Sequence, residues 1–386
     1  MKALTAYTHE IDNIDLAVSE ILSQLQSEQS LCKNSVGIIS CYPEFIDSGV
    51  CAALTEALPF DVIGHTTMAS GIDEEYGFTM LSLLVLTGDD VSFSTALSED
   101  ITQGQGKPLK NMYAKALENL DGEPKMALVY APIINTMGCE LVVEALNEVC
   151  GGVPIFGTLA SDHTDDYHLS QVIYEGKGSR NQSTIILISG QVNPRFSIMS
   201  IPEEKVLRQK ALVTEAVGNT IISVNDMSCV DYMRTVGLVV EDMSINGISA
   251  IPVMVDYNNG MEPFAMGMLI NEDGLAACGC SVPTGASLSI GTLLSEDIVK
   301  ATETVVQQVL NGQEEGDGVA LMYSCISRLL ILGLDAEAEL ERIGAGLSGK
   351  LSHMISYSNG ELCPAYDKDG KAVNRIHNFS LVSCVF

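Results

Sequence analysis

Positively charged residues are scarce in this sequence. Its 386 residues include 20 Lys and Arg against 50 Asp and Glu, so the formal net charge is −30. A protein that binds nucleic acid neutralises phosphates with Lys and Arg, and an anionic membrane surface attracts the same residues. We therefore expect neither among the partners. Hydrophobic residues make up 46% of the chain, which excludes an intrinsically disordered protein.

Long hydrophobic runs are also missing. The most apolar stretches, such as residues 81–86 and 185–188, are short, and none approaches the ~18 residues that a membrane-spanning helix needs. Asp12 and Asp15 interrupt the N-terminal segment, so we expect no signal peptide. The 11 cysteines are odd in number and scattered through apolar segments, which is typical of reduced thiols. These features predict an acidic, cytoplasmic protein without membrane insertion.

A strand, an amphipathic helix and a second strand that ends in small residues recur three times. The expected strands are 36–40 with 60–64, 126–131 with 153–156, and 319–324 with 353–357, and the expected helices are 47–58, 139–149 and 336–343. Apolar runs joined by short turns lie between these units and predict antiparallel strands.

We therefore predict an α/β fold of two mixed α/β sandwich-like domains, with duplicated strand–helix–strand units and antiparallel meanders. The apolar pattern is interrupted from Gly190 to Pro194. This interruption places the domains at residues 1–195 and 196–386.

Motifs for catalysis and for metal binding are weak. Glycines 344, 346 and 349 match a dinucleotide-binding pattern in letters, but they follow a predicted helix instead of opening one. The Asp and His residues at 162–168 match no metal-ligand spacing known to us. Cys325 and His377 remain an alternative for nucleophilic catalysis, which requires a base within reach of the thiol. We assign no catalytic residue, no metal ligand and no cofactor.

Polar residues at strand ends are better candidates for a binding site, because ligands of open α/β sheets sit beyond the carboxyl ends of the strands. Arg328 offers a planar fork to a carboxylate, and Glu361 can accept from an ammonium group. A site with both could bind an amino acid. The open alternative is that Arg328 and Glu361 pair with each other, or that Arg328 pairs with another acid.

Small residues at the other strand ends let a ligand approach the backbone closely. The candidate ligand-binding residues are Gly64, Thr66, Thr67, Gly157, Cys325, Arg328, Gly360, Glu361, His377 and Asn378.

Short motifs in this order resemble the FIST family of bacterial sensory proteins, over nearly the whole chain. The N-terminal FIST domain is matched by VIGHTTMASG (62–71) and FGTLASD (156–162). The C-terminal FIST domain is matched by VTEAVGNTI (213–221), VPTG (282–285), SCISR (324–328), GE (360–361) and HNFS (377–380).

The resemblance implies a cytoplasmic small-ligand sensor in signal transduction, which binds an amino acid or a similar small metabolite. The signal would pass to a separate partner protein, namely a histidine kinase, a cyclic-di-GMP enzyme or a chemotaxis protein. Relatives that bind haem imply an alternative, a haem-based nitric oxide sensor, for which His65 and His377 are the best-placed ligands. A Cys/His-dependent enzyme is the other alternative.

Overall fold

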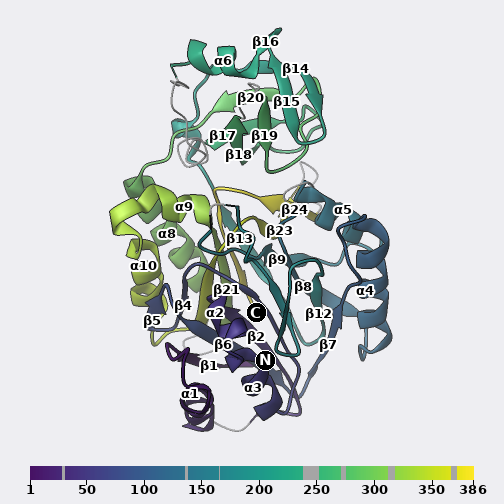
Figure 1. The fold of residues 1–386 in the computed structure, drawn as a ribbon, viewed down its shortest axis with the longest axis vertical. Helices are drawn as coiled ribbons and strands as arrows, with labels where there is room; N and C mark the ends of the chain where they lie inside the picture. The colour runs from purple at the N-terminus through teal and green to yellow at the C-terminus, as the bar shows by residue number, and fades with distance from the viewer. Residues whose placement is uncertain are drawn as a thin grey trace.

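The computed structural model describes residues 1–27, 31–134, 138–164, 166–237, 252–270, 275–311, 318–366 and 372–386. Asp165 of the acidic loop at 162–168 lies outside these ranges. Helices surround a group of central strands on three sides, and a smaller, β-rich part lies above them (Figure 1). Within the described ranges, no helix combines the length and the apolar character needed to cross a membrane.

The first unit is a six-stranded sheet with helices on its outer face. Its strand β2 is buried on both faces from Val36 to Cys41, as is usual for a strand beside a parallel neighbour. β2 pairs in parallel with β3 and antiparallel with β6. The elements are β1 (Lys2–Thr8), α1 (Ile14–Ser27), β2 (Asn34–Cys41), α2 (Glu44–Asp47), α3 (Val50–Ala57), β3 (Val62–Thr66), β4 (Ser70–Ile72), β5 (Glu75–Gly77) and β6 (Leu81–Gly88).

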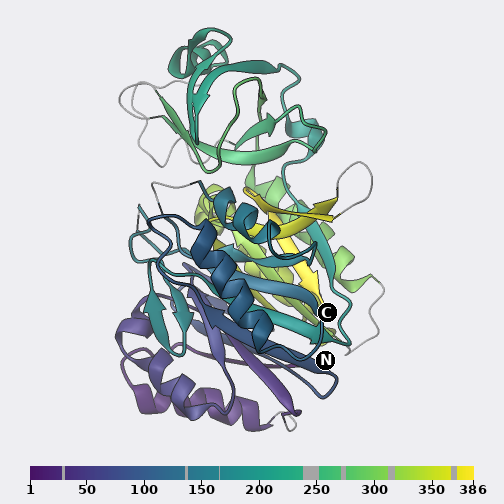
Figure 2. The same ribbon diagram turned by 90° about the vertical axis from the view of Figure 1, so that its right-hand side faces the viewer.

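The second unit repeats this plan. Helix α4 buries Leu109, Met112, Tyr113 and Ala116, which recur at helical spacing and so form one apolar face. Figure 2 shows α4, the blue helix near its centre, lying across the strands of this sheet. The elements are β7 (Val91–Leu97), α4 (Gly106–Glu118), β8 (Pro124–Ala131), α5 (Glu140–Asn147), β9 (Ile155–Leu159), β10 (Val172–Tyr174), β11 (Lys177–Ser179) and β12 (Thr184–Gly190).

The third unit has the same plan, but a separate β-rich domain follows its first strand. The parallel pair here is β21 with β22. The elements are β13 (Arg195–Met199), η1 (Glu203–Lys205), α8 (Ser295–Leu310), β21 (Val319–Cys325), α9 (Ile326–Leu332), η2 (Gly333–Asp335), α10 (Ala338–Leu347), β22 (Ser352–Ser358), β23 (Glu361–Tyr366), β24 (Ala372–His377) and β25 (Leu381–Val385).

Each unit gives a hairpin to the sheet of another unit, in a closed cycle. The hairpin β4–β5 follows β3 of the first unit and pairs with β22 of the third. The hairpin β10–β11 follows β9 of the second unit and pairs with β3 of the first. The hairpin β23–β24 follows β22 of the third unit and pairs with β9 of the second. The three sheets therefore share one strand order, β1-β6-β2-β3-β10-β11, β7-β12-β8-β9-β23-β24 and β13-β25-β21-β22-β4-β5.

The three sheets, which we call the ring, enclose one hydrophobic core. Ile38 and Ile63 of the first unit, Leu128 of the second, and Leu321 and Met354 of the third all belong to this core. The outer faces of the sheets pack against helices in separate clusters. Each sheet is thus buried on both faces, which explains why its strands read as near-continuous apolar runs.

The β-rich domain, which we call the insert, spans β14 to β20. It is a seven-stranded sheet with the strand order β14-β20-β17-β18-β19-β15-β16. It lies at the top of Figure 1 and borders α9 and α5 of the ring. Its elements are β14 (Ala211–Val217), β15 (Thr220–Val224), β16 (Met227–Ser228), α6 (Cys229–Thr235), β17 (Pro252–Asp256), β18 (Phe264–Ile270), β19 (Ala276–Cys278) and β20 (Ser287–Ile290).

The predicted mixed α/β class is confirmed, and the three predicted strand–helix–strand units are present. All 11 cysteines are free thiols. The division between residues 195 and 196 stays a prediction, and it falls at the first residue of β13. Two sheets combine strands from both sides of this division, because β22 pairs with β4 and β23 pairs with β9.

Only glycine fits at positions 64 and 157, where the parallel strands approach each other closely. A Cβ on Gly64 would lie 1.9 Å from the carbonyl oxygen of Ile39, and one on Gly157 would lie 1.9 Å from that of Val129. Either backbone must then move. We expect Gly64→Ala and Gly157→Ala each to lower the free energy of unfolding by about 3 kcal/mol, measured by urea denaturation. Gly106→Ala is the control, since no atom lies within 4 Å of its Cβ position; equal losses in all three variants would contradict the packing argument.

Candidate functional site

The ends of the second parallel strands of the three units meet and bond to one another. The backbone N–H of Ser161 donates to the carbonyl of Thr66 at 3.0 Å, and that of Asn359 donates to the carbonyl of Leu159 at 3.1 Å. The hydroxyl of Thr67 donates to the carbonyl of Tyr357 at 2.8 Å and closes the cycle. The strand ends of all three units therefore form a single hydrogen-bonded centre.

The predicted residues Gly64, Thr66, Thr67 and Gly157 belong to this centre. Thr66 and Thr67 are at most 1% exposed. The hydroxyl of Thr66 donates to the carbonyl of Gln171 at 3.3 Å and accepts from the N–H of Gln171 at 2.9 Å. These side chains are engaged in closing the ring and are shielded from solvent.

A buried histidine lies among two tyrosines inside the ring. The imidazole of His65 stacks on Tyr130, with ring centroids 4.9 Å apart, and meets Tyr323 edge-on at 5.5 Å. Its Nε2 lies 2.9 Å from the hydroxyl of Ser356. Burial lowers the pKa of His65 to about 3, so the imidazole is neutral at physiological pH.

Arg328 is fully buried, and its partner is Glu339 on α10. The guanidinium donates to Glu339 Oε1 from Nε at 3.1 Å and from Nη2 at 2.5 Å. The hydroxyls of Ser324 and Thr302 also donate to Glu339, and Arg328 lowers the pKa of this carboxyl against the effect of burial. Of the alternatives that the sequence left open, the structure has Arg328 paired with another acid, within the helical layer of the third unit, and not with Glu361, which opens β23.

Glu361 is completely buried and accepts hydrogen bonds from two hydroxyls. Ser358 donates at 2.7 Å and Ser380 at 2.6 Å. Burial raises the pKa of Glu361 to about 8, against the weaker effects of these hydroxyls. The carboxyl is therefore mostly protonated at pH 7. Cys325 reaches the same place, since its N–H donates to the carbonyl of Ser380 at 2.9 Å.

Cys325 and His377 do not form an activated pair in this geometry. Burial raises the pKa of the Cys325 thiol to about 12, whereas a nucleophilic cysteine has a lowered one. Nε2 of His377 is engaged by the carbonyl of Cys363 at 3.0 Å, and burial lowers the pKa of His377 to about 4. Asn378 donates from Nδ2 to the sulfur of Cys280 at 3.9 Å.

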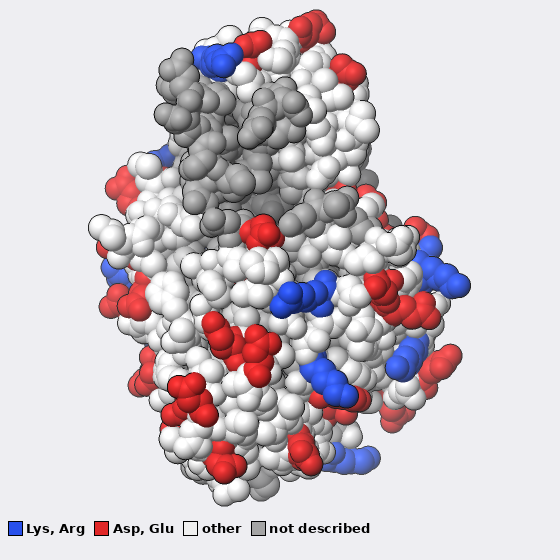
Figure 3. Space-filling view, viewed as in Figure 1, with Lys and Arg blue, Asp and Glu red and all other residues white. Residues whose placement is uncertain are grey.

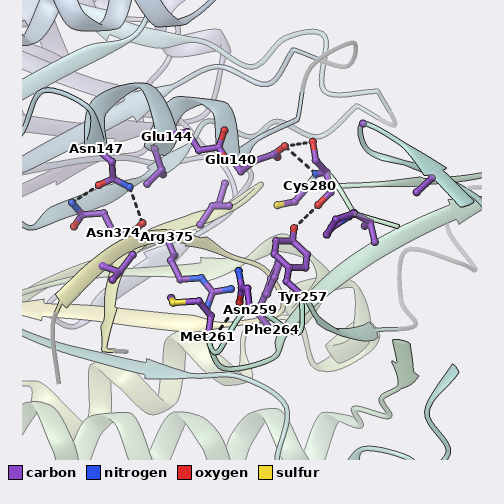
Figure 4. A pocket seen from close by; sticks show the side chains of 18 residues that line it. Glu140, Glu144, Asn147, Tyr257, Asn259, Met261, Phe264, Cys280, Asn374 and Arg375 are labelled. Carbon is purple, nitrogen blue, oxygen red and sulfur yellow. Dashed lines mark hydrogen bonds between the residues drawn. The ribbon is translucent and has the colours of Figure 1, made fainter. Parts of the chain in front are cut away.

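A pocket of about 550 Å³ lies between the insert and the second unit (Figure 4). Helix α5 and strand β24 form one wall, and loops and strands of the insert form the other. The lining residues are Glu140, Val143, Glu144, Asn147, Ala216, Gly218, Tyr257, Asn259, Met261, Phe264, Cys280, Ser281, Val282, Pro283, Val373, Asn374, Arg375 and Ile376.

Arg375 provides positive charge at this pocket. Its guanidinium carbon lies 4.6 Å from the ring centroid of Phe264, and Nη1 donates to the carbonyl of Glu262 at 3.2 Å. Arg375 forms an ion pair with none of the described carboxylates. The side chain is half-buried, and burial lowers its pKa.

Negative charge lies on the facing helix. Glu140 Oε1 accepts from the N–H of Ser281 at 2.9 Å and from its hydroxyl. Glu140 Oε2 is buried and has no hydrogen-bond partner in the described structure. The pKa of Glu144 is raised by burial and by the nearby carboxylates of Glu140 and Glu148. A cation placed here would relieve this crowding of carboxylates.

The sequence did not single out Glu140 or Arg375. Arg375 stands two residues before the predicted His377. Because side chains alternate along a strand, these two lie on the same face of β24. The contribution of the insert could not be read from the chain, because Tyr257, Phe264 and Ser281 become neighbours of α5 only through the tertiary fold.

Haem does not fit the residues of this pocket. Its described lining contains no histidine. His65 and His377 are buried, with Nε2 atoms engaged by Ser356 and Cys363. Both imidazoles are shielded from solvent in this conformation.

The buried ion pair predicts a large loss of stability on truncation. Arg328→Ala leaves the Glu339 carboxylate buried without its cation, and we expect a loss of about 3–5 kcal/mol in the free energy of unfolding. The double variant Arg328→Met with Glu339→Leu removes both charges and should recover most of this loss. Urea denaturation measures both. If the double variant were as unstable as Arg328→Ala, the loss would come from packing and not from the stranded charge.

Glu361 predicts a pH dependence of stability. Its folded pKa of about 8 lies above that of an unfolded Glu, so its contribution is fully present below the unfolded pKa and is lost as pH rises towards 8. Glu361→Gln keeps the shape and cannot ionise. We expect the free energy of unfolding of the variant, relative to that of the wild type, to rise by up to about 1.4 kcal/mol per pH unit between pH 5 and 8. Urea denaturation of both proteins measures the difference, in which the opposite contributions of His65 and His377 cancel. A constant difference across this range would contradict the shift.

Family models match most of the chain. The FIST N domain matches residues 35–227, and the FIST C domain matches residues 231–364. No curated protein matches the sequence. Among solved structures, cyanuric acid hydrolase from A. caulinodans aligns with 100% of this chain and 98% of its own, at 10% identity and a TM-score of 0.41, which is too low to support an argument about this chain. FIST domains are sensory domains of signal transduction, and by these two matches the chain belongs to the FIST family.

Proposed function

We propose that this protein senses a free amino acid with an apolar side chain, bound in the pocket between the insert and the second unit. The observation that carries the proposal is Arg375. A half-buried guanidinium without an ion pair to any described carboxylate is unusual in a chain with 50 acidic residues. Its N–H groups that have no partner among the described residues suit the planar carboxylate of a ligand.

The opposite wall supplies what an ammonium group needs. Glu140 and Glu144 lie on α5, on the other side of the pocket from Arg375 (Figure 4). Glu140 has a buried oxygen without a partner, and an unpaired buried acceptor costs free energy that an ammonium donor would recover. Separate positive and negative ends select a zwitterion over a simple anion.

The remaining lining favours an apolar side chain. Val143, Met261, Phe264, Val282 and Ile376 face the pocket, and burial of ligand carbon against them contributes roughly 25 cal/mol per Å². A volume of about 550 Å³ lies within the range of small-molecule sites. The pocket is thus large enough for any of the common amino acids.

The signal would pass to a separate protein. FIST domains are associated with sensing in signal transduction, and the partner classes that the family suggests are histidine kinases, cyclic-di-GMP enzymes and chemotaxis proteins. On the face shown in Figure 3, acidic side chains are scattered over the ring among a smaller number of basic ones. The arrangement suits recognition by shape better than by a single charged patch.

Titration calorimetry with each of the 20 common amino acids tests the proposal. We expect apolar L-amino acids such as L-leucine to bind, and L-aspartate and L-lysine to bind weakly or not at all. Arg375→Gln should weaken binding by about 2–5 kcal/mol, because it removes one member of a desolvated charge pair. Arg375→Lys should recover only part of this, since Lys lacks the bidentate fork.

Arg234→Gln is the matched control. Arg234 belongs to the insert, where it pairs with Asp231 on the exposed surface of α6, and it does not line the pocket. Its removal should leave the affinity unchanged. Equal losses for Arg234→Gln and Arg375→Gln, or binding that survives Arg375→Gln, would remove the pocket from the proposal.

A further inference from the structure

Among the contacts of the described residues, two groups of hydrogen bonds join the insert to different units of the ring. The first group lies in a pair of short segments, 205–207 and 290–292, which we call the stalk. In the stalk, the N–H of Leu207 donates to the carbonyl of Ile290 at 2.8 Å, and that of Thr292 donates to the carbonyl of Lys205 at 2.9 Å. Lys205 Nζ then lies 2.9 Å from Asp297 Oδ1, and Asp297 Oδ2 accepts from the N–H of Leu294 at the start of α8. The stalk thus fixes the insert to the third unit.

The second group lies at the pocket and joins the insert to the second unit. Here the N–H of Cys139 donates to the carbonyl of Gly279 at 3.1 Å. The N–H and the hydroxyl of Ser281 both donate to Glu140 Oε1. We call the two bonds from Ser281 the latch. The stalk and the latch attach the insert to different units, so movement at the latch would turn the insert about the stalk.

The two oxygens of Glu140 have different surroundings. Oε1 carries the whole latch, while Oε2 is buried without a partner among the described residues. The carboxylate folds back over Gly138, where an added Cβ would lie 2.4 Å from Oε1 and 2.5 Å from Oε2. The lack of a side chain at position 138 therefore leaves room for the carboxylate between Ser281 and the pocket.

Resting on the proposed function, we propose that Glu140 couples amino-acid binding to the position of the insert. Oε2 accepts a hydrogen bond from the ammonium group of the ligand, while Oε1 keeps its two hydrogen bonds from Ser281. A bound ligand therefore orders the carboxylate and strengthens the latch. The coupling is reciprocal, because an insert held by Ser281 presents an ordered carboxylate to the ligand. The closed insert is then the state that the partner protein reads.

Hydrogen–deuterium exchange of the full-length protein without ligand tests the latch. Gly138→Ala displaces the carboxylate without changing charge, and Ser281→Ala removes one of its two donors. Both should raise the exchange rate of residues 276–284 by about 10-fold and leave the stalk segment 203–209 unchanged. Ser287→Ala is the control, since Ser287 bonds to Asn258 within the insert. The proposal would be overturned if residues 276–284 exchanged at the wild-type rate in both latch variants. It would also be overturned if exchange of the stalk segment were accelerated equally.

L-Leucine is the probe for coupling. It should slow exchange at residues 276–284 in the wild type by about 10-fold and have no effect in Glu140→Gln, which can still accept from Ser281 but lacks the charge. Equal protection of both proteins would overturn the role of Glu140. L-Leucine that binds by calorimetry without changing exchange would overturn this inference alone. Absence of both heat and protection would overturn the proposed ligand class together with this inference, whatever the latch variants show.

Discussion

The structure depends on a cyclic exchange of hairpins among three similar units. None of the three sheets is complete without two strands from another unit, and the cycle returns to its start through the pairing of β4 with β22. Strands that pair with a distant part of the chain form only after a long loop has closed. The hairpin β23–β24 therefore has to be in place before the sheet that contains β8 and β9 has its full set of strands. A unit cut from the ring would expose unpaired strand edges.

This closure explains why the polar strand ends are buried. Thr67, Ser161 and Asn359 stand where ligands often bind in open α/β sheets, but here the three strand ends face one another and their polar groups bond across the centre. The stacked rings of His65 and Tyr130 lie within the same central group. A polar centre with well-defined partners fixes the relative positions of the units better than an apolar one could, because a shift leaves buried groups unpaired. The pocket accordingly lies where the insert meets the ring.

Local patterns were enough to predict the units but not their assembly. The parallel pairs formed by β2, β8 and β21 were predictable because their apolar runs and the amphipathic helices that follow are local signals. The exchange of hairpins was not, since the short strands of residues 70–77 and 172–179 carry no mark of the sheet they will join. Arg328 was singled out as a candidate ligand-binding residue, with a pairing to an acid as the open alternative. Its partner is Glu339, four residues beyond η2, and the choice between Glu339 and Glu361 depends on the direction in which β23 leaves. The pocket required the position of the insert, which no periodicity encodes.

Three of the buried or half-buried charged residues, Arg328, Glu361 and Arg375, have different surroundings, and the contrast supports the functional interpretation. Arg328 is neutralised by an ion pair with additional hydroxyl donors. Glu361 is mostly uncharged at neutral pH because burial raises its pKa, and its two oxygens bond to the hydroxyls of Ser358 and Ser380. In both cases groups of the protein itself compensate the charge or remove it, although Nη1 of Arg328 has no hydrogen-bond partner among the described residues. Among the described residues, Arg375 contacts a carbonyl oxygen and the face of Phe264 and no carboxylate, although acidic side chains are abundant in the chain. If Arg375 served only to stabilise the fold, we would expect a carboxylate beside its guanidinium. Recognition of an anionic ligand requires instead that the guanidinium remains accessible from the pocket.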